Sequence, residues 1–367
     1  MSVLAALAAI AVLAVLILVH EFGHFIAARS QGIYVNRFSL GFGPVVWKYQ
    51  GPQTEYAIRA FPLGGFVGFP DDDPDSDIPP EDPNLLRNRP ILDRAIVISA
   101  GVIANLIFAY LLLVTQVSFI GIDIPQAIQS GVLIPELVSQ PVSVAAKAGI
   151  QPGDVILAAD NRTFGTSQED LKAFTEIIKS HLGKEIALTI ARGDQQLSVN
   201  LTPEANAKGE GSIGVRLAPN QKVVRRRVTN PLEALSIGAT EFQRIFSMII
   251  QGFGQLITNF GETASQVAGP VKIVEIGANI AQNDAGRLFF FAALISINLA
   301  FINILPLPAL DGGQLAFLLI EGLRGKPLPN RVQEGVMQTG LVILLGLGIF
   351  LIVKETTQLE WVQRLFQ

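Results

Sequence analysis

Four long apolar runs constrain the fold of this chain more than any other feature. They cover residues 3–19, 95–122, 288–305 and 336–353, and Ser296, Asn298 and Asn303 interrupt the third. A helix rises about 1.5 Å per residue, so about 20 apolar residues span the hydrocarbon layer of a bilayer. Since 50% of the residues are hydrophobic and 16% are charged, the sequence predicts a polytopic α-helical membrane protein with about four transmembrane helices.

The first run, residues 3–19, has an alternative interpretation as a secretory signal peptide. No basic segment precedes it, no Ala-x-Ala site followed by polar sequence ends it, and it continues into Glu21 and His24. A signal peptide has the opposite features, so a transmembrane helix is the better interpretation.

Charged residues and cysteine content limit the topology, the partners and the metal ligands that this chain can have. Basic residues gather before the second run (Arg29, Arg37, Lys48, Arg59, Arg87, Arg89 and Arg94) and between the third and fourth (Arg324, Lys326 and Arg331). By the positive-inside rule both segments should be cytoplasmic, which places both termini outside. The net charge is only -4 and the basic cluster at residues 225–227 is short, so no nucleic-acid binding is expected. Because cysteine is absent, any metal must be held by His, Asp or Glu.

Between residues 126 and 219 the pattern changes to short β-rich runs separated by turns. These runs cover residues 132–138, 155–159, 185–191 and 197–202, and residues 168–180 have the pattern of an amphipathic helix. Residues 145–156, AAKAGIQPGDVI, resemble the most recognisable stretch of bacterial PDZ domains. We therefore expect one inserted α+β PDZ-like domain, which would bind a peptide C-terminus as an added strand at Gly131, Val132 and Leu133.

These features divide the chain into four predicted parts. Residues 1–122 are a first membrane half, 123–222 the PDZ-like domain, 223–286 a linker and 287–367 a second membrane half. Within the linker, residues 231–263 have apolar residues at helical spacing. This amphipathic helix could lie on the membrane surface or pack against the transmembrane helices.

The sharpest chemical signal is His20-Glu21-Phe22-Gly23-His24. Residues four apart share one face of a helix, so His20 and His24 can bind one zinc ion while Glu21 reaches a water molecule on it. Alternatively, these residues could anchor a helix end among headgroups. Several ionisable groups in a membrane helix are costly and usually functional, which favours the metal site.

A catalytic zinc site takes three protein ligands and leaves one position open for water. The remaining histidine, His181, lies in the PDZ-like domain, so a carboxylate near the end of another transmembrane helix is the better candidate. Asp311 fits, because it lies in the segment NILPLPALDGG, where prolines break the helix and glycines allow an unusual turn. The alternative is an aspartate that only caps a helix.

Four motifs, in this order, resemble the signatures of the site-2 protease family of intramembrane zinc metalloproteases, which includes the bacterial regulator of sigma-E protease. They are HEFGH at residues 20–24, FPLGGFV at 61–67, GVIAN at 101–105 and NILPLPALDGG at 303–313. The resemblance covers nearly the whole chain and is to the single-PDZ type. Two departures are Val102, where relatives often have proline, and one PDZ-like segment where the sigma-E regulator has two.

The resemblance implies one Zn²⁺ per chain, held by His20, His24 and Asp311, with Glu21 as general base. It implies that Asn303 donates a hydrogen bond to substrate or to the oxyanion, although Asn303 could instead satisfy backbone groups freed by the prolines. A membrane-associated β-hairpin would present substrate as an extended strand, or only close the site. Substrate contacts are then expected at Gly64, Gly65, Phe66, Val67, Asn105, Pro306 and Pro308.

The expected function is cleavage of single-span membrane proteins within the lipid bilayer, such as anti-sigma factors or remnant signal peptides. The expected location is the bacterial cytoplasmic (inner) membrane, with the active site near the cytoplasmic face and the PDZ-like domain outside. That domain would bind a newly exposed C-terminus or exclude substrates with bulky external domains. The alternatives are a non-catalytic PDZ scaffold and a zinc transporter, and the intact HExxH motif with its general base disfavours both.

Overall fold

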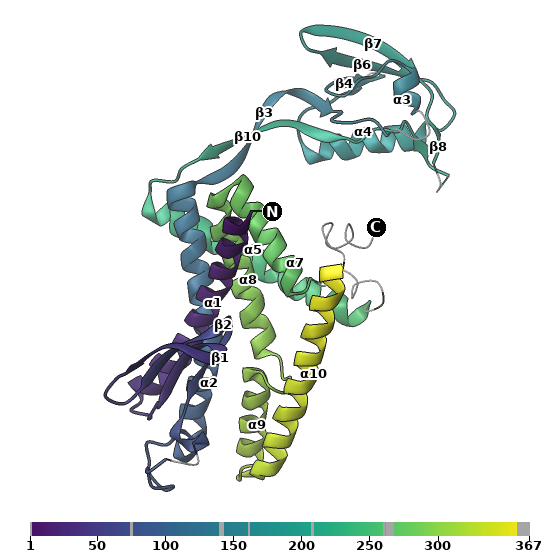
Figure 1. The fold of residues 1–367 in the computed structure, drawn as a ribbon. Coiled ribbons are helices and arrows are strands. Elements are labelled where there is room, and N and C mark those ends of the chain that lie inside the picture. The colour runs from purple at the N-terminus through teal and green to yellow at the C-terminus, as the bar shows by residue number, and fades with distance from the viewer. Residues whose placement is uncertain are drawn as a thin grey trace. The chain divides into compact units, whose positions relative to one another are not determined.

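The computed structural model describes residues 2–73, 76–138, 143–160, 162–206, 209–259, 261 and 268–357 (Figure 1). The chain folds as two compact units. Residues 1–121 and 227–367 form the membrane unit, and residues 122–226 form the PDZ-like unit. The PDZ-like unit begins and ends near the predicted boundaries of 123 and 222, whereas the predicted linker of residues 223–286 belongs to the membrane unit.

In the described part of the chain, four helical segments are long and apolar enough to cross a membrane. They contain α1 (Val3–Ser30), α2 (Ile91–Thr115), α8 (Leu288–Ile304) and α10 (Asn330–Thr357), and a π-helical turn at Gln116–Ile120 extends α2. The Ser2 hydroxyl caps α1 by accepting from the Ala5 N–H. These helices confirm the predicted polytopic architecture.

Helices α1, α2 and α8 pack against one another and form the centre of the membrane unit (Figure 1). Small residues allow the close approach, since a Cβ at Gly23 of α1 would lie only 2.4 Å from the carbonyl oxygen of Ala100 in α2. Helix α5 (Pro231–Thr258) buries Ile245 and Ile249 against α2 and α8. Of the two alternatives for residues 231–263, the structure therefore shows the one in which the helix packs against the transmembrane helices. Helix α7 (Pro270–Asn283), which the sequence did not predict, packs against α1 and α10.

A small sheet connects α1 to α2, and it is longer than the predicted hairpin at residues 61–67. Its strands are β1 (Arg37–Gln50) and β2 (Glu55–Gly68). Both strands bend, so Leu40 of β1 pairs with both Ile58 and Gly65 of β2. The last part of β2 consequently forms an outer edge, and its only strand partner among the described residues is β1.

The PDZ-like unit contains a sheet with the strand order β10-β3-β4-β6-β7, and β5 also pairs with β4. The strands are β3 (Ile122–Leu133), β4 (Val155–Ala159), β5 (Arg162–Thr163), β6 (Ile186–Arg192), β7 (Gln195–Leu201) and β10 (Ala218–Arg226). A second small sheet pairs β8 (Glu204–Ala205) with β9 (Gly211–Ser212). Helices α3 (Val144–Lys147) and α4 (Gln168–Ser180) complete the unit, and α4 begins with a capping box of Ser167 and Asp170. Phe174 of α4 is fully buried in a core with β4 and β6, so the unit has its own hydrophobic core.

One predicted strand of this unit is shifted. Residues 132–138 were expected to form a strand, but β3 begins at Ile122 and ends at Leu133. Beyond it, Leu137 makes only an isolated bridge to Val215. The early start of β3 is explained by β10, which pairs with residues 122–127 as well as with residues 132 and 133.

The backbone breaks between α8 and α9 (Asp311–Arg324), as the prolines predict. Helix α8 ends at Ile304, and Ala309 in the break has a φ of +68°, which is unusual for a residue with a side chain. Gly312 and Gly313 then allow α9 to start against the preceding chain, because a Cβ at Gly312 would lie 2.2 Å from the Leu305 oxygen. This turn places Asp311 at the first position of α9.

Candidate active site

Two histidines on one face of α1 lie against α2 and are nearly buried. The side chains of His20 and His24 are 10% and 12% exposed. Gly101 of α2 makes room for both rings, since a Cβ there would lie 2.3 Å from His24 Nε2 and 2.7 Å from His20 Cε1. The glycine of the Gly-x-x-x-Asn motif is therefore needed because any side chain at Gly101 would collide with the two imidazoles.

The two rings are oriented by groups on α2. His24 Nδ1 lies 2.8 Å from the carbonyl oxygen of Val97. A carbonyl can only accept, so Nδ1 carries the proton and Nε2, with its lone pair, faces Asp311 and His20. His20 Nδ1 lies 3.4 Å from the side-chain amide of Asn105.

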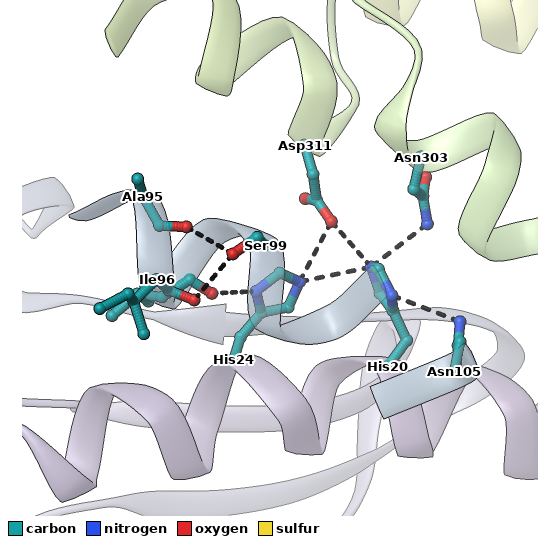
Figure 2. Close-up of polar contacts among 9 residues, drawn as sticks. His20, His24, Ala95, Ile96, Ser99, Asn105, Asn303 and Asp311 are labelled. Carbon is teal, nitrogen blue, oxygen red and sulfur yellow. Dashed lines mark hydrogen bonds and ion pairs between the residues drawn. The ribbon is translucent and has the colours of Figure 1, made fainter. Parts of the chain in front are cut away.

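The third side chain of the cluster comes from α9. Figure 2 shows Asp311 facing both imidazoles, with Oδ2 3.3 Å from His20 Nε2 and 3.4 Å from His24 Nε2. The two Nε2 atoms are themselves 3.3 Å apart. Asp311 Oδ2 is buried and has no hydrogen-bond partner among the described residues, so it is an acceptor that points at the two lone pairs.

This triangle fits a metal ion. Zn²⁺ binds His nitrogen and carboxylate oxygen at about 2.0–2.2 Å, and the corners of a tetrahedron of that size are separated by about 3.3–3.5 Å. The measured separations of 3.3, 3.3 and 3.4 Å agree. Among the described residues, these three are also the group of His, Asp and Glu side chains close enough to hold an ion together.

Glu21 lies beside the cluster, next to the outer edge of the small sheet. Its carboxylate interacts electrostatically with His20, His24 and Asp311, and it accepts a hydrogen bond from the backbone N–H of Val67. A Cβ at Gly65 would lie 2.8 Å from Glu21 Cγ. The motif at residues 61–67 thus places a strand edge directly against the predicted general base.

Figure 2 shows Asn303 of α8 on the same side of the His20 ring as Asp311. Its Nδ2 lies 3.3 Å from His20 Nε2, and the residue is 9% exposed. Pro306 is exposed in the break, whereas Pro308 packs against Gly340 of α10. Asn105 is fully buried beside His20, so the predicted substrate contact of Asn105 is not available in this structure.

The predicted peptide-binding turn of the PDZ-like unit lies inside its sheet rather than at an edge. Val132 pairs with Pro219 of β10 on one side and with Ile156 of β4 on the other. Leu133 is likewise paired on both sides, and the N–H of Gly131 donates to the Gly165 oxygen. A peptide cannot add as a strand at these residues, because both edges are occupied. The sequence did not reveal this because β10 is distant in the chain.

A His-His-Asp cluster with an adjacent glutamate, set among helices apolar enough to cross a membrane, is typical of a membrane metalloprotease. The model of peptidase family M50 matches residues 8–347, and the chain belongs to this family. Relatives of this family are named as zinc metalloproteases, which implies zinc as the metal.

Three relatives illustrate the breadth of the match. A protein of Nostoc sp. whose name assigns it to the zinc metalloproteases is 76% identical over 100% of both chains. Membrane metalloprotease ARASP, chloroplastic, of Arabidopsis thaliana is 46% identical and is matched over 95% of this chain and 78% of its own. Regulator of sigma-E protease RseP of Escherichia coli is 30% identical over 91% of this chain and 95% of its own. Among solved structures, the PDZ domain of the SdrC-like protein from Listeria monocytogenes is 26% identical and covers 24% of this chain and 87% of its own, with a TM-score of 0.21.

The roles of three groups at or behind this site were not found by sequence reasoning. The Val97 carbonyl has no sequence signal, because every residue carries the same backbone group. Ser296, whose hydroxyl donates to the Asn105 backbone oxygen at 2.9 Å, reads only as an interruption of an apolar run. Gly101 belonged to a recognised motif, but only the structure shows that its missing side chain accommodates the imidazoles.

Proposed function

We propose that this chain is an intramembrane zinc endopeptidase that cuts single-span membrane proteins. The observation that carries the proposal is the triangle of His20, His24 and Asp311, with edges of 3.3–3.4 Å, next to Glu21 and to the last part of β2, which pairs with β1 alone among the described strands. One Zn²⁺ per chain would be held there by two imidazoles and one carboxylate, which is a ligand set with room for water.

Zinc in this site would acidify a water molecule and polarise the scissile carbonyl. Glu21 takes the proton from the attacking water and returns it to the leaving amine. Its carboxylate is suited to both transfers because it lies beside all three ligands. Asn303 points its Nδ2 toward the same centre, so it can donate to the oxyanion. The charge of Asp311 offsets part of the positive charge that the metal brings into a poorly hydrated site.

The edge at Gly65, Phe66 and Val67 is proposed to hold the substrate. A transmembrane helix hides its peptide bonds in internal hydrogen bonds and must unwind before attack. An unwound segment paired with this edge would lie beside Glu21, because the Val67 N–H bonds to that carboxylate. Gly64, with a φ of +117°, turns the strand, and a Cβ there would overlap Phe42. Exposed Pro306 would border the substrate on the other side, with Pro308 supporting it.

The proposed substrates are anti-sigma factors or remnant signal peptides, by analogy with the sigma-E regulator among the relatives. The proposed location is a bacterial cytoplasmic membrane, with the active site near the cytoplasmic face and the PDZ-like unit outside, because the basic residues gather between α1 and α2 and between α9 and α10. The PDZ-like unit would bind a peptide C-terminus at an edge other than residues 131–133, or exclude substrates with bulky external domains.

The proposal is tested by reconstituting the purified chain in vesicles with a tagged single-span substrate. Zinc content and cleavage are measured for the wild type and for Asp311→Ala, with His181→Ala as a matched control outside the cluster. We expect Asp311→Ala to lose both zinc and cleavage, and His181→Ala to keep both.

Each alternative function gives a different pattern in this assay. A scaffold binds zinc without cutting any of several substrates, and a zinc transporter moves zinc into vesicles without cutting. Cleavage by Asp311→Ala at the wild-type rate contradicts the proposed ligand set.

A further inference from the structure

Asn105 is a buried polar residue that the proposed chemistry leaves without a role. It is 0% exposed on α2, one turn after Gly101, and its side-chain amide lies 3.4 Å from His20 Nδ1. Its backbone oxygen accepts from the Ser296 hydroxyl of α8, while its side chain is left for His20. A buried amide needs hydrogen-bond partners, so its position beside a metal-site imidazole requires an explanation.

The His20 ring faces two environments. Its Nε2 points at Asp311 and His24, each 3.3 Å away, while its Nδ1 points at Asn105. A neutral imidazole that offers the Nε2 lone pair carries its proton on Nδ1. That N–H is buried and requires an acceptor. For His24 the Val97 carbonyl fills this role at 2.8 Å.

The Asn105 amide can supply the same kind of acceptor to His20. In the structure the amide nitrogen faces Nδ1, and Oδ1 is buried with no hydrogen-bond partner among the described residues. The nitrogen and oxygen are nearly the same size, and their assignment follows from the hydrogen-bond network rather than from shape. A half-turn of the amide places Oδ1 against the Nδ1–H and converts a contact between two nitrogens into an N–H···O hydrogen bond.

We infer that Asn105 is a positioning residue for the metal centre, whose Oδ1 accepts the Nδ1–H of His20 and thereby fixes the tautomer and the ring plane. Asn105 and Val97, which lie two turns apart on the same face of α2, then do the same task for the two histidines. The inference rests on the proposed zinc site. Partners of this kind contribute about 10- to 100-fold to metal affinity.

The test compares two substitutions in the full-length chain, purified in detergent. Asn105→Leu is close in shape and has no acceptor, while Asn105→Asp presents an oxygen in either orientation. Zinc affinity is measured by competition with a chromogenic chelator. We expect Asn105→Leu to bind zinc about 10- to 100-fold more weakly than the wild type, and Asn105→Asp to stay within about threefold of it.

Ser296→Ala is the matched control. It removes a buried hydrogen bond at the same level of the α2–α8 interface but leaves the Asn105 amide in place. We expect a lower melting temperature with unchanged zinc affinity, which separates loss of packing from loss of the acceptor. If Asn105→Leu does not give folded protein, Asn105→Ala against Asn105→Asp provides the same contrast.

Two results would overturn the inference. One is an Asn105→Leu chain that binds zinc as tightly as the wild type. The other is an Asn105→Asp chain as weak as Asn105→Leu, because a residue that only packs is not rescued by an acceptor. A wild-type chain that binds no zinc at all overturns the proposed function as well, so the two failures are distinguishable.

Discussion

Glycines decide how closely the polypeptide approaches the metal cluster. Added Cβ atoms would lie 2.3 Å from His24 Nε2 at Gly101, 2.8 Å from Glu21 Cγ at Gly65 and 2.2 Å from the Leu305 oxygen at Gly312. All three distances are shorter than real Cβ contacts, so a side chain at any of them must displace a part of the site.

Gly101→Ala is predicted to abolish zinc binding. The added methyl group meets both imidazoles, which α1 and the Val97 carbonyl hold in place, so the ligands cannot keep their separations. The zinc content of the purified chain measures the effect. Gly252→Ala in α5 is the control, because nothing lies within 4 Å of its Cβ, and it should bind zinc normally and gain up to about 1 kcal/mol of stability. Full zinc content in Gly101→Ala would contradict this account of the motif.

In the PDZ-like unit, Asp154 is the polar centre of the stretch that resembles PDZ domains. It is 1% exposed and accepts from Arg192 Nε at 2.8 Å and from the Gln151 N–H at 2.8 Å. Burial alone would raise the pKa of Asp154, but the hydrogen bonds from Arg192 and Gln151 outweigh it and lower the pKa below its ordinary value.

Asp154→Asn is therefore predicted to destabilise the PDZ-like unit by about 2 kcal/mol at neutral pH, because it removes charge-assisted hydrogen bonds. The folded-state pKa lies below the unfolded value of about 3.9, so the ionic contribution is complete above that pH and is lost as the pH falls through the folded pKa. Urea unfolding of residues 122–226, which have their own core, should show the difference from wild type shrinking below about pH 4. A difference that is constant from pH 7 to pH 3, or as large in the exposed control Asp194→Asn, would contradict the assignment.

Among the elements, α2 connects the parts of the site. It carries Val97, Gly101 and Asn105 on the face toward α1, and near its start Arg94 forms a two-pronged ion pair with Glu321 of α9 at 3.0 and 2.5 Å. Both side chains are largely buried, at 16% and 14% exposed. Since Asp311 is the first residue of α9, this pair holds the helix of the third ligand on the helix that orients the other two.

Glu321→Gln is predicted to destabilise the membrane unit by about 3 kcal/mol, because it leaves Arg94 buried without its counter-charge. Unfolding in mixed micelles measures the loss, and exchanging the two residues (Arg94→Glu with Glu321→Arg) should recover part of it. The matched control is Glu241→Gln, which breaks the exposed pair with Arg244 in α5 and should cost less than about 1 kcal/mol. Equal costs for the two pairs would show that α9 is not held by this contact.

The elements that the sequence predicted are those with a local signal. The four apolar runs gave the membrane helices because length and composition suffice. Helix α7 was missed because it has only 14 residues and carries Lys272 and Glu275, so it does not stand out as an apolar run. Most of β1 and β2 was missed because their bends interrupt the alternation. At the site, the spacing of His20 and His24 and the helix break at Asp311 were readable. The Val97 carbonyl and the occupied edges at Val132 depend on contacts distant in the chain, which no local pattern reports.

In the whole molecule, the PDZ-like unit is an insertion in the chain of the membrane unit, between residues 121 and 227. Its first and last residues, Ile122 and Arg226, pair with each other in β3 and β10, so the two ends of the insertion lie side by side. All three proposed zinc ligands belong to the membrane unit. Replacing residues 122–226 by a short Gly-Ser linker is therefore predicted to leave zinc binding unchanged, as measured by metal content. Loss of zinc from a folded linker variant would contradict the independence of the two units.

The same linker variant also tests the role of the PDZ-like unit in the cleavage assay. New cutting of substrates with bulky external domains would favour the size-filter role over peptide binding.

If Glu21 transfers the proton in a zinc-dependent hydrolysis, as we propose, Glu21→Gln should separate zinc binding from cleavage. Wild type and Glu21→Gln are reconstituted at equal density in vesicles with a tagged single-span substrate, and cleavage and zinc content are measured together. We expect Glu21→Gln to keep its zinc and to cut about 10²- to 10⁴-fold more slowly, which is the usual contribution of a general base. Cleavage at the wild-type rate by zinc-loaded Glu21→Gln would contradict the proposed role of Glu21.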